Sequence, residues 1–177
     1  MAETVLVTGF EPFKQWTVNS SGEVARTLGA QMAGLVRAEV LPVDHEAAHR
    51  RMTELLVEVR PGACLAMGLW AGSSFRIERY ARRCPGLGHI DGPAELEGAW
   101  DWSEMERQLA ETGTAVIHSE DAGKYVCDTT YWSLLDSRRR QGFPERAAFL
   151  HVPPLSDVWS IEELTRAVAR VISAITR

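Results

Sequence analysis

Short apolar runs alternate along the chain with longer segments whose apolar residues return every three to four positions. The short runs predict strands, and the periodic segments predict helices. The predicted strands are Thr4–Gly9, Ala38–Val43, Ala63–Gly68, Ser74–Ala81, Ala115–His118 and Ala147–Val152. Helices are expected to open within Asn19–Glu23 and after Asp44, and to cover Trp102–Glu111, Val126–Arg139 and Ser160–Thr176. This alternation is typical of an α/β protein with a largely parallel sheet.

Polar residues in front of the periodic segments mark where helices begin. Ser20 and Glu23 have the spacing of a capping box, as do Ser160 and Glu163. Asp44 precedes a segment of clear helical period and is expected to cap it. The sequence therefore predicts three defined helix starts.

A stretch without any period lies in the middle of the chain, at Cys84–Asp101. It is rich in Gly and Pro, which predicts a long loop. We find no internal repeat and no domain linker, and 177 residues correspond to about one domain. Residues 1–177 are therefore expected to form a single domain.

Composition and charge narrow the class of protein. The sequence is 45% hydrophobic and 24% charged, close to the average of globular domains. Its net charge of -5 argues against a nucleic-acid partner, whose phosphates attract basic surfaces. The sequence has no run of about 18 apolar residues and no secretory signal at its start. We expect a cytoplasmic protein that binds neither nucleic acid nor membrane.

The three cysteines are Cys64, Cys84 and Cys127, an odd number without a Cys-x-x-Cys pair. At least one thiol is therefore free. Cys127 lies where a loop meets a predicted helix, and the positive end of a helix favours a thiolate. Cys127 is accordingly a candidate nucleophile, although most free cysteines are simply small buried apolar residues.

A thiol nucleophile needs a base, and five histidines are available. His151 ends a strongly apolar strand, and active sites collect at the carboxyl ends of strands in open parallel sheets. A hydrogen-bonded core histidine would show the same pattern. His45 and His49 lie one helical turn apart on an expected solvated face, without a third ligand that would indicate a metal site.

The base in turn needs an acceptor that orients it, and Glu78 is the candidate. Glu78 stands in an apolar and basic strand between Arg76 and Arg79. Exposed ion pairs with these arginines are the simpler interpretation of the pattern.

Four segments together resemble the pyroglutamyl peptidase I family of cysteine peptidases, also called pyrrolidone carboxyl peptidases. Residues 5–13, VLVTGFEPF, followed by Asn19-Ser20-Ser21, are similar to the opening signature of the family. Residues 77–81, 123–128 and 149–153 resemble its glutamate, nucleophile and histidine motifs. The four segments follow the family's order and cover most of the chain.

The resemblance implies a three-layer α/β/α sandwich around a mostly parallel, partly mixed sheet. It also implies that Cys127 is the nucleophile, that His151 is the general base and then acid, and that Glu78 holds the imidazole. The implied reaction removes N-terminal pyroglutamate from peptides through a thioester. It needs neither a cofactor nor a metal, and the family suggests a homo-oligomer, a dimer or a tetramer.

An uncharged five-membered lactam suits an apolar aromatic slot with a few polar contacts. The resemblance places Phe10 and Phe13 in that slot. Main-chain groups around Tyr125 and Val126, together with Asn19, are expected to fix the lactam edge or its loop.

The sequence departs from the family pattern at several positions near the expected pocket. Lys14 and Gln15 replace two glycines, and Ser20 replaces a proline. Leu69 replaces a glutamine, and Asp128 replaces an asparagine beside the nucleophile, where its charge raises the pKa of the thiol. The loop after Glu78 is also shorter than in the family. These changes leave two alternatives, a related thiol hydrolase with a shifted acyl specificity and a noncatalytic binding protein on the same scaffold.

Overall fold

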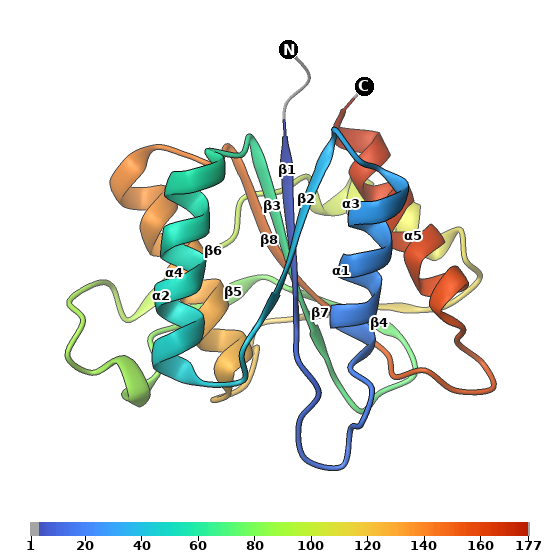
Figure 1. The fold of residues 1–177 in the computed structure, drawn as a ribbon, viewed down its shortest axis with the longest axis horizontal. Coiled ribbons are helices and arrows are strands. Elements are labelled where there is room, and N and C mark those ends of the chain that lie inside the picture. Colours follow the sequence, from blue (N-terminus) through green and yellow to red (C-terminus); the bar gives the residue numbers. More distant parts are fainter. Residues whose placement is uncertain (1–3, 177) are drawn as a thin grey trace.

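A twisted sheet between two helical layers forms the centre of the computed structural model, which describes residues 4–176 (Figure 1). The sheet has six strands in the order β2-β1-β3-β8-β4-β7. The strands are β1 Val5–Phe10, β2 Val36–Leu41, β3 Ala63–Leu69, β4 Phe75–Glu78, β7 Val116–Ser119 and β8 Arg146–Val152. The helices are α1 Ser20–Gln31, α2 His45–Val59, α3 Trp102–Ala110, α4 Val126–Gln141 and α5 Ile161–Ile175. The predicted three-layer α/β/α arrangement is confirmed.

Strand direction changes once within the sheet. β2, β1, β3 and β8 are parallel, whereas β4 runs antiparallel to β8 and parallel to β7. The sheet is therefore mostly parallel and partly mixed, as expected. The antiparallel pairing sets Arg76 opposite His151 and Glu78 opposite Phe149.

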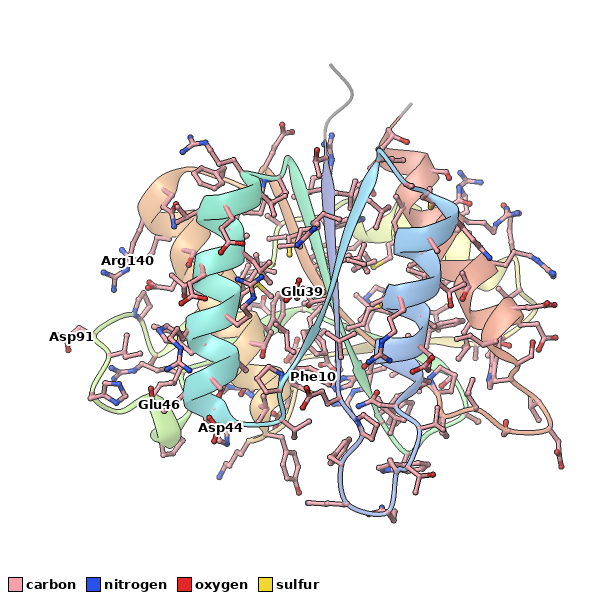
Figure 2. The ribbon with its side chains drawn as sticks, viewed as in Figure 1. Phe10, Glu39, Asp44, Glu46, Asp91 and Arg140 are labelled. Atoms are coloured by element: carbon pink, nitrogen blue, oxygen red, sulfur yellow. The ribbon has the colours of Figure 1, made fainter. Side chains whose placement is uncertain are left out.

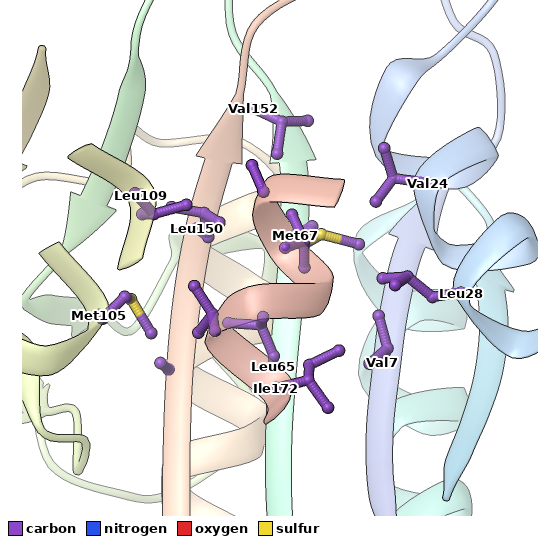
Figure 3. Packing of buried hydrophobic residues seen from close by; sticks show 14 of the residues in the cluster. Val7, Val24, Leu28, Leu65, Met67, Met105, Leu109, Leu150, Val152 and Ile172 are labelled. Atoms are coloured by element: carbon purple, nitrogen blue, oxygen red, sulfur yellow. The ribbon is translucent and has the colours of Figure 1, made fainter. Parts of the chain in front are cut away.

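Successive side chains along each strand point to opposite faces of the sheet, so the sheet has a separate hydrophobic core on each face. Leu65 and Met67 point to the side of α1, α3 and α5, where they pack with Leu150 and Ile172 (Figure 3). The intervening residues of β3 belong to the second core, which α2 and α4 cover. None of the helices within residues 4–176 is long and apolar enough to cross a membrane.

The predicted strand Ser74–Ala81 is interrupted. The main-chain N–H of Arg79 donates to Ser119, and its carbonyl accepts from Gly98, so the chain leaves the main sheet after β4. A short strand, β5 Tyr80–Arg82, then pairs with β6 Glu95–Glu97. The expected loop Cys84–Asp101 thus contains a strand as well as a short 3-10 turn, η1 Pro85–Leu87.

Two of the three predicted caps are confirmed. The Asp44 side chain accepts from the N–H of Ala47, and Ser160 and Glu163 form a complete capping box on α5. The capping box at Ser20 is wrong, because the side chain of Asn19 caps α1 by accepting from the N–H of Ser21. β2 also starts two residues earlier than predicted, since Val36 pairs with Val5.

Candidate active site

The three candidate catalytic side chains come together on the α2 and α4 side of the sheet. His151 is the next-to-last residue of β8, and Glu78 is the last residue of β4. Cys127 is the second residue of α4. Because β4 runs antiparallel to β8, Glu78 pairs with Phe149, two residues before His151, and Arg76 is the residue that pairs with His151. The sequence places these residues far apart, and the sheet topology brings them together.

The imidazole and the carboxylate form a buried pair. His151 Nδ1 lies 2.6 Å from Glu78 Oε1, and the two side chains are 6% and 0% exposed. A carboxylate can only accept a hydrogen bond, so the proton of the neutral imidazole lies on Nδ1. Nε2 is therefore left free to accept a proton. Glu78 does pair with Arg76, as the simpler interpretation expects, but the carboxylate is buried and not exposed.

Gly68 on β3 borders both the thiol of Cys127 and the imidazole of His151. It pairs with His151 across the sheet. A Cβ at this position would lie 2.8 Å from Cys127 Sγ and 3.2 Å from His151 Cδ2. The sulfur and the imidazole ring therefore both border the space that a side chain at position 68 would occupy.

The environment of the half-buried Cys127 favours the neutral thiol. Desolvation, followed by the charges of Glu78 and Asp128, raises the pKa of Cys127 to about 12. The N–H of Cys127 itself lowers this pKa, but its effect is smaller. The helix start therefore acts on the thiol in the predicted direction, while burial and the two carboxylates act against it. A proton acceptor is required when the sulfur attacks.

Asp128 adds to this effect, as the sequence predicts. Asp128 is 3% exposed, and its carboxylate accepts the main-chain N–H of Arg82 at 2.8 Å. Burial raises the pKa of Asp128 to about 6. Above that pH, Asp128 places a negative charge next to the nucleophile.

Cys127 and His151 line a cavity of about 550 Å³. Phe10, Phe13, Asn19, Tyr125 and Val126, the five residues expected to bind substrate, all line it. Figure 2 shows Phe10 on the side of the molecule where α2 begins at Asp44. The volume is within the range of sites for small ligands.

The predicted substrate residues differ in what they offer to a ligand. Phe10 and Val126 present buried apolar surface, whereas Tyr125 is 67% exposed at the rim. Asn19 Oδ1 accepts from both N–H and Oγ of Ser21, and its Nδ2 donates to the carbonyl of Glu11. Asn19 therefore holds the loop that carries Phe13 rather than presenting a free amide.

Several residues of the cavity were not singled out as site residues from the sequence. Arg76, Trp70 and Lys14 line it. Gly68 lies beside it, where a Cβ would approach both Cys127 Sγ and His151 Cδ2. The signal for Arg76 was available, because residues i and i+2 of a strand share a face. The backbone of Lys14 has φ 51°, in the left-handed region that glycine adopts easily and other residues rarely adopt.

Two further histidines lie between α2 and α4, and one of them, His45, also lines the cavity. His45 and His49 do not occupy a solvated face, because they contact Thr129 and Ser133 of α4 at 2.6 and 2.7 Å. The two helices pack closely enough to bring these polar groups together. Within residues 4–176, no three His, Cys, Asp or Glu side chains are arranged to hold a metal ion.

A thiol, an imidazole and a buried carboxylate beside an apolar cavity are typical of thiol hydrolases. The model of the pyroglutamyl peptidase family matches residues 3–170. The chain belongs to this family of peptidases.

Named relatives agree with this assignment. The chain is 36% identical over 172 residues to the pyrrolidone-carboxylate peptidase of Chromobacterium violaceum, an alignment that covers 88% of this chain and 80% of that protein. It is 28% identical to human pyroglutamyl-peptidase 1, covering 96% and 88%. Among solved structures, pyrrolidone carboxyl peptidase of Pyrococcus furiosus superposes with a TM-score of 0.84 at 25% identity, covering 97% of both chains.

Proposed function

We propose that this chain hydrolyses the bond after an N-terminal pyroglutamate, with Cys127 as nucleophile, His151 as base and acid, and Glu78 as the orienting group. The observation that carries the proposal is the 2.6 Å contact of His151 with Glu78, at an aromatic cavity that His151 and Cys127 line. The names of the relatives support the substrate class. They give no support to the two alternatives over this function.

The reaction begins with a thiol. His151 Nε2 takes the proton from Cys127 as Sγ bonds to the carbonyl carbon that joins pyroglutamate to the next residue. The N–H groups at the start of α4 stabilise the oxyanion that forms. The intermediate then breaks its C–N bond, and Nε2 gives the proton to the departing amine.

The second half releases the acyl group. His151 takes a proton from water, the oxygen bonds to the thioester carbon, and the C–S bond breaks. The sulfur recovers its proton from the imidazole, and pyroglutamate leaves as a carboxylic acid. Throughout both halves, Glu78 accepts the Nδ1 hydrogen bond and stabilises the imidazolium.

The charges of the cavity suit an uncharged N-terminus. A free ammonium would need an available carboxylate. Among the described residues that line the cavity, Asp121 is the only one with a carboxylate. That carboxylate already accepts from Gly123 and lies 3.5 Å from Arg82. A lactam, which has no ammonium, needs no such partner.

A pair of fluorogenic amides tests the proposal. Pyroglutamyl and prolyl amides share a five-membered ring, but only the prolyl amide carries an ammonium. We expect release from the pyroglutamyl amide alone, with strong losses in Cys127→Ala, His151→Ala and Glu78→Gln. Cys64→Ala removes a buried thiol of the core and is the matched control. The proposal fails if wild type releases no more product than Cys127→Ala.

The same assay separates the alternatives. A shifted acyl specificity would appear as faster release from a prolyl or glutaminyl amide. A noncatalytic binding protein would release nothing from any of the three amides. A cytoplasmic location and assembly into a dimer or a tetramer stay predictions, and gel filtration with light scattering measures the assembly.

A further inference from the structure

Arg76 is held rigidly beside the candidate triad. Its Nε lies 2.9 Å from Glu78 Oε1, the same oxygen that contacts His151. Its Nη2 donates to Ser119 Oγ at 2.6 Å and to the carbonyl of Asp121 at 2.5 Å. The guanidinium also lies 5.4 Å from the ring centre of Trp70. Contacts on three sides fix this side chain in one orientation.

The strand geometry explains why Arg76 reaches both partners. It is two residues before Glu78 on β4, so the two side chains share a face of the sheet. It also pairs directly with His151 on β8. Arg76 is 26% exposed and lines the cavity, whereas Glu78 is completely buried. The guanidinium therefore lies between the buried carboxylate and the cavity.

The burial of Glu78 creates a need for a cation. Its Oε2 has no hydrogen-bond partner within the described part of the chain. A buried carboxylate is costly unless it is paired with a charge and hydrogen-bonded. Arg76 supplies that charge together with a directed N–H.

We propose that Arg76 is a positioning residue, which keeps the carboxylate of Glu78 aimed at His151 and balances its charge near Cys127. The contacts of Arg76 do not depend on the proposed function, whereas its effect on turnover rests on that function. Removing Arg76 leaves the charge of Glu78 uncompensated. The pKa of the Cys127 thiol, which Glu78 already raises, then rises further.

Other groups also influence this charge balance and must stay constant in the test. The charged and titratable groups around the carboxylate of Glu78 are Arg76, His151, Cys127, Asp128 and Tyr131. The hydroxyl of Tyr131 donates to the main-chain carbonyl of Glu78 and not to its carboxylate.

The first experiment needs no substrate. The rate of iodoacetamide alkylation at Cys127 is measured from pH 7 to pH 9 by mass spectrometry of the peptide that contains it. In Arg76→Met, we expect the rate at pH 8 to fall about tenfold, which corresponds to a rise of about one pKa unit. Arg76→Lys keeps the charge and should stay within about twofold of wild type. An unchanged rate in a folded Arg76→Met protein overturns the proposal.

The second experiment asks whether Arg76 acts through Glu78. We expect Arg76→Met to lower kcat on a pyroglutamyl amide about 10- to 100-fold, with a much smaller effect on KM. In a Glu78→Gln background, the same change should cost less than about threefold, because the partner of Arg76 is already lost. An equal loss in both backgrounds contradicts the role.

Two controls separate the possible failures. Arg107→Met removes one guanidinium from the surface of α3, where it pairs with Glu104 and Glu111, and should change neither readout. Thermal unfolding of each variant shows whether it folds. If wild type hydrolyses no pyroglutamyl amide, the proposed function fails, and the alkylation rates still decide the role of Arg76.

Discussion

At the scale of single residues, Gly68 is a steric requirement of the site. Any Cβ there would lie 2.8 Å from Cys127 Sγ and 3.0 Å from Phe149 Cζ. Such contacts force sulfur or ring out of place, and displacements of this size cost about 100-fold in rate. We expect Gly68→Ala to lose about that much kcat/KM on a pyroglutamyl amide while the protein stays folded by circular dichroism. Wild-type turnover in Gly68→Ala would rule out this packing.

Asp128 is a second residue whose substitution should change the reactivity of Cys127 in a definite direction. Asp128→Asn keeps an oxygen that can accept the N–H of Arg82 but removes the charge that raises the pKa of Cys127. We expect alkylation of Cys127 at pH 8 to become several-fold faster. The matched control is Asp157→Asn, which removes a carboxylate from an exposed loop and should leave the rate unchanged. A slower rate in Asp128→Asn would contradict the charge argument.

The same substitution predicts a pH-dependent change in stability. Burial raises the pKa of Asp128 to about 6 in the folded protein, so the folded state holds this proton more firmly than the unfolded state. The stabilisation is complete below the ordinary pKa of an aspartate and is lost as the pH rises through about 6. Asp128→Asn should therefore raise the free energy of unfolding by about 2 kcal/mol at pH 8 and by almost nothing at pH 4. Urea unfolding at the two pH values measures both.

At the scale of elements, α5 depends on its capping box. Ser160 Oγ accepts from the N–H of Glu163, and the Glu163 carboxylate accepts from the N–H of Ser160. Ser160→Ala should lower the free energy of unfolding by about 1 kcal/mol. Ser173→Ala makes the same chemical change later in α5 and should cost less than about 0.5 kcal/mol. Neither variant should change kcat/KM, because α5 covers the face of the sheet opposite the site.

The elements also differ in how far the sequence predicts them. The starts of α2 and α5 follow from local capping chemistry, and both were predicted correctly. The division of residues 74–81 into β4 and β5 was not predicted, because apolar residues continue to alternate with polar ones on both sides of Arg79. The hydrogen bonds that divide this segment come from Ser119 and Gly98, which are distant in the sequence.

At the scale of the whole molecule, occupation of the cavity should stabilise the fold. A ligand that binds only the folded state adds free energy in proportion to the logarithm of its concentration over Kd. Pyroglutamate aldehyde forms a reversible hemithioacetal with a thiol, so we expect it to raise the Tm of wild type by several degrees. Cys127→Ala should lose most of this shift. Proline aldehyde is the matched probe and should shift the Tm of wild type less.

The sequence by itself determined the α/β class, the helix caps at Asp44 and Ser160 and the candidate triad, because these follow from short-range periodicity and from motifs. It did not show that Glu78 is buried, that Gly68 borders both the sulfur and the imidazole or that Arg76 shares an oxygen with His151. The places of Glu78 and Arg76 depend on β4 running antiparallel to β8, and that of Gly68 depends on the parallel register of β3 and β8. Strand order and direction are set by packing between distant segments, so only the tertiary structure establishes them.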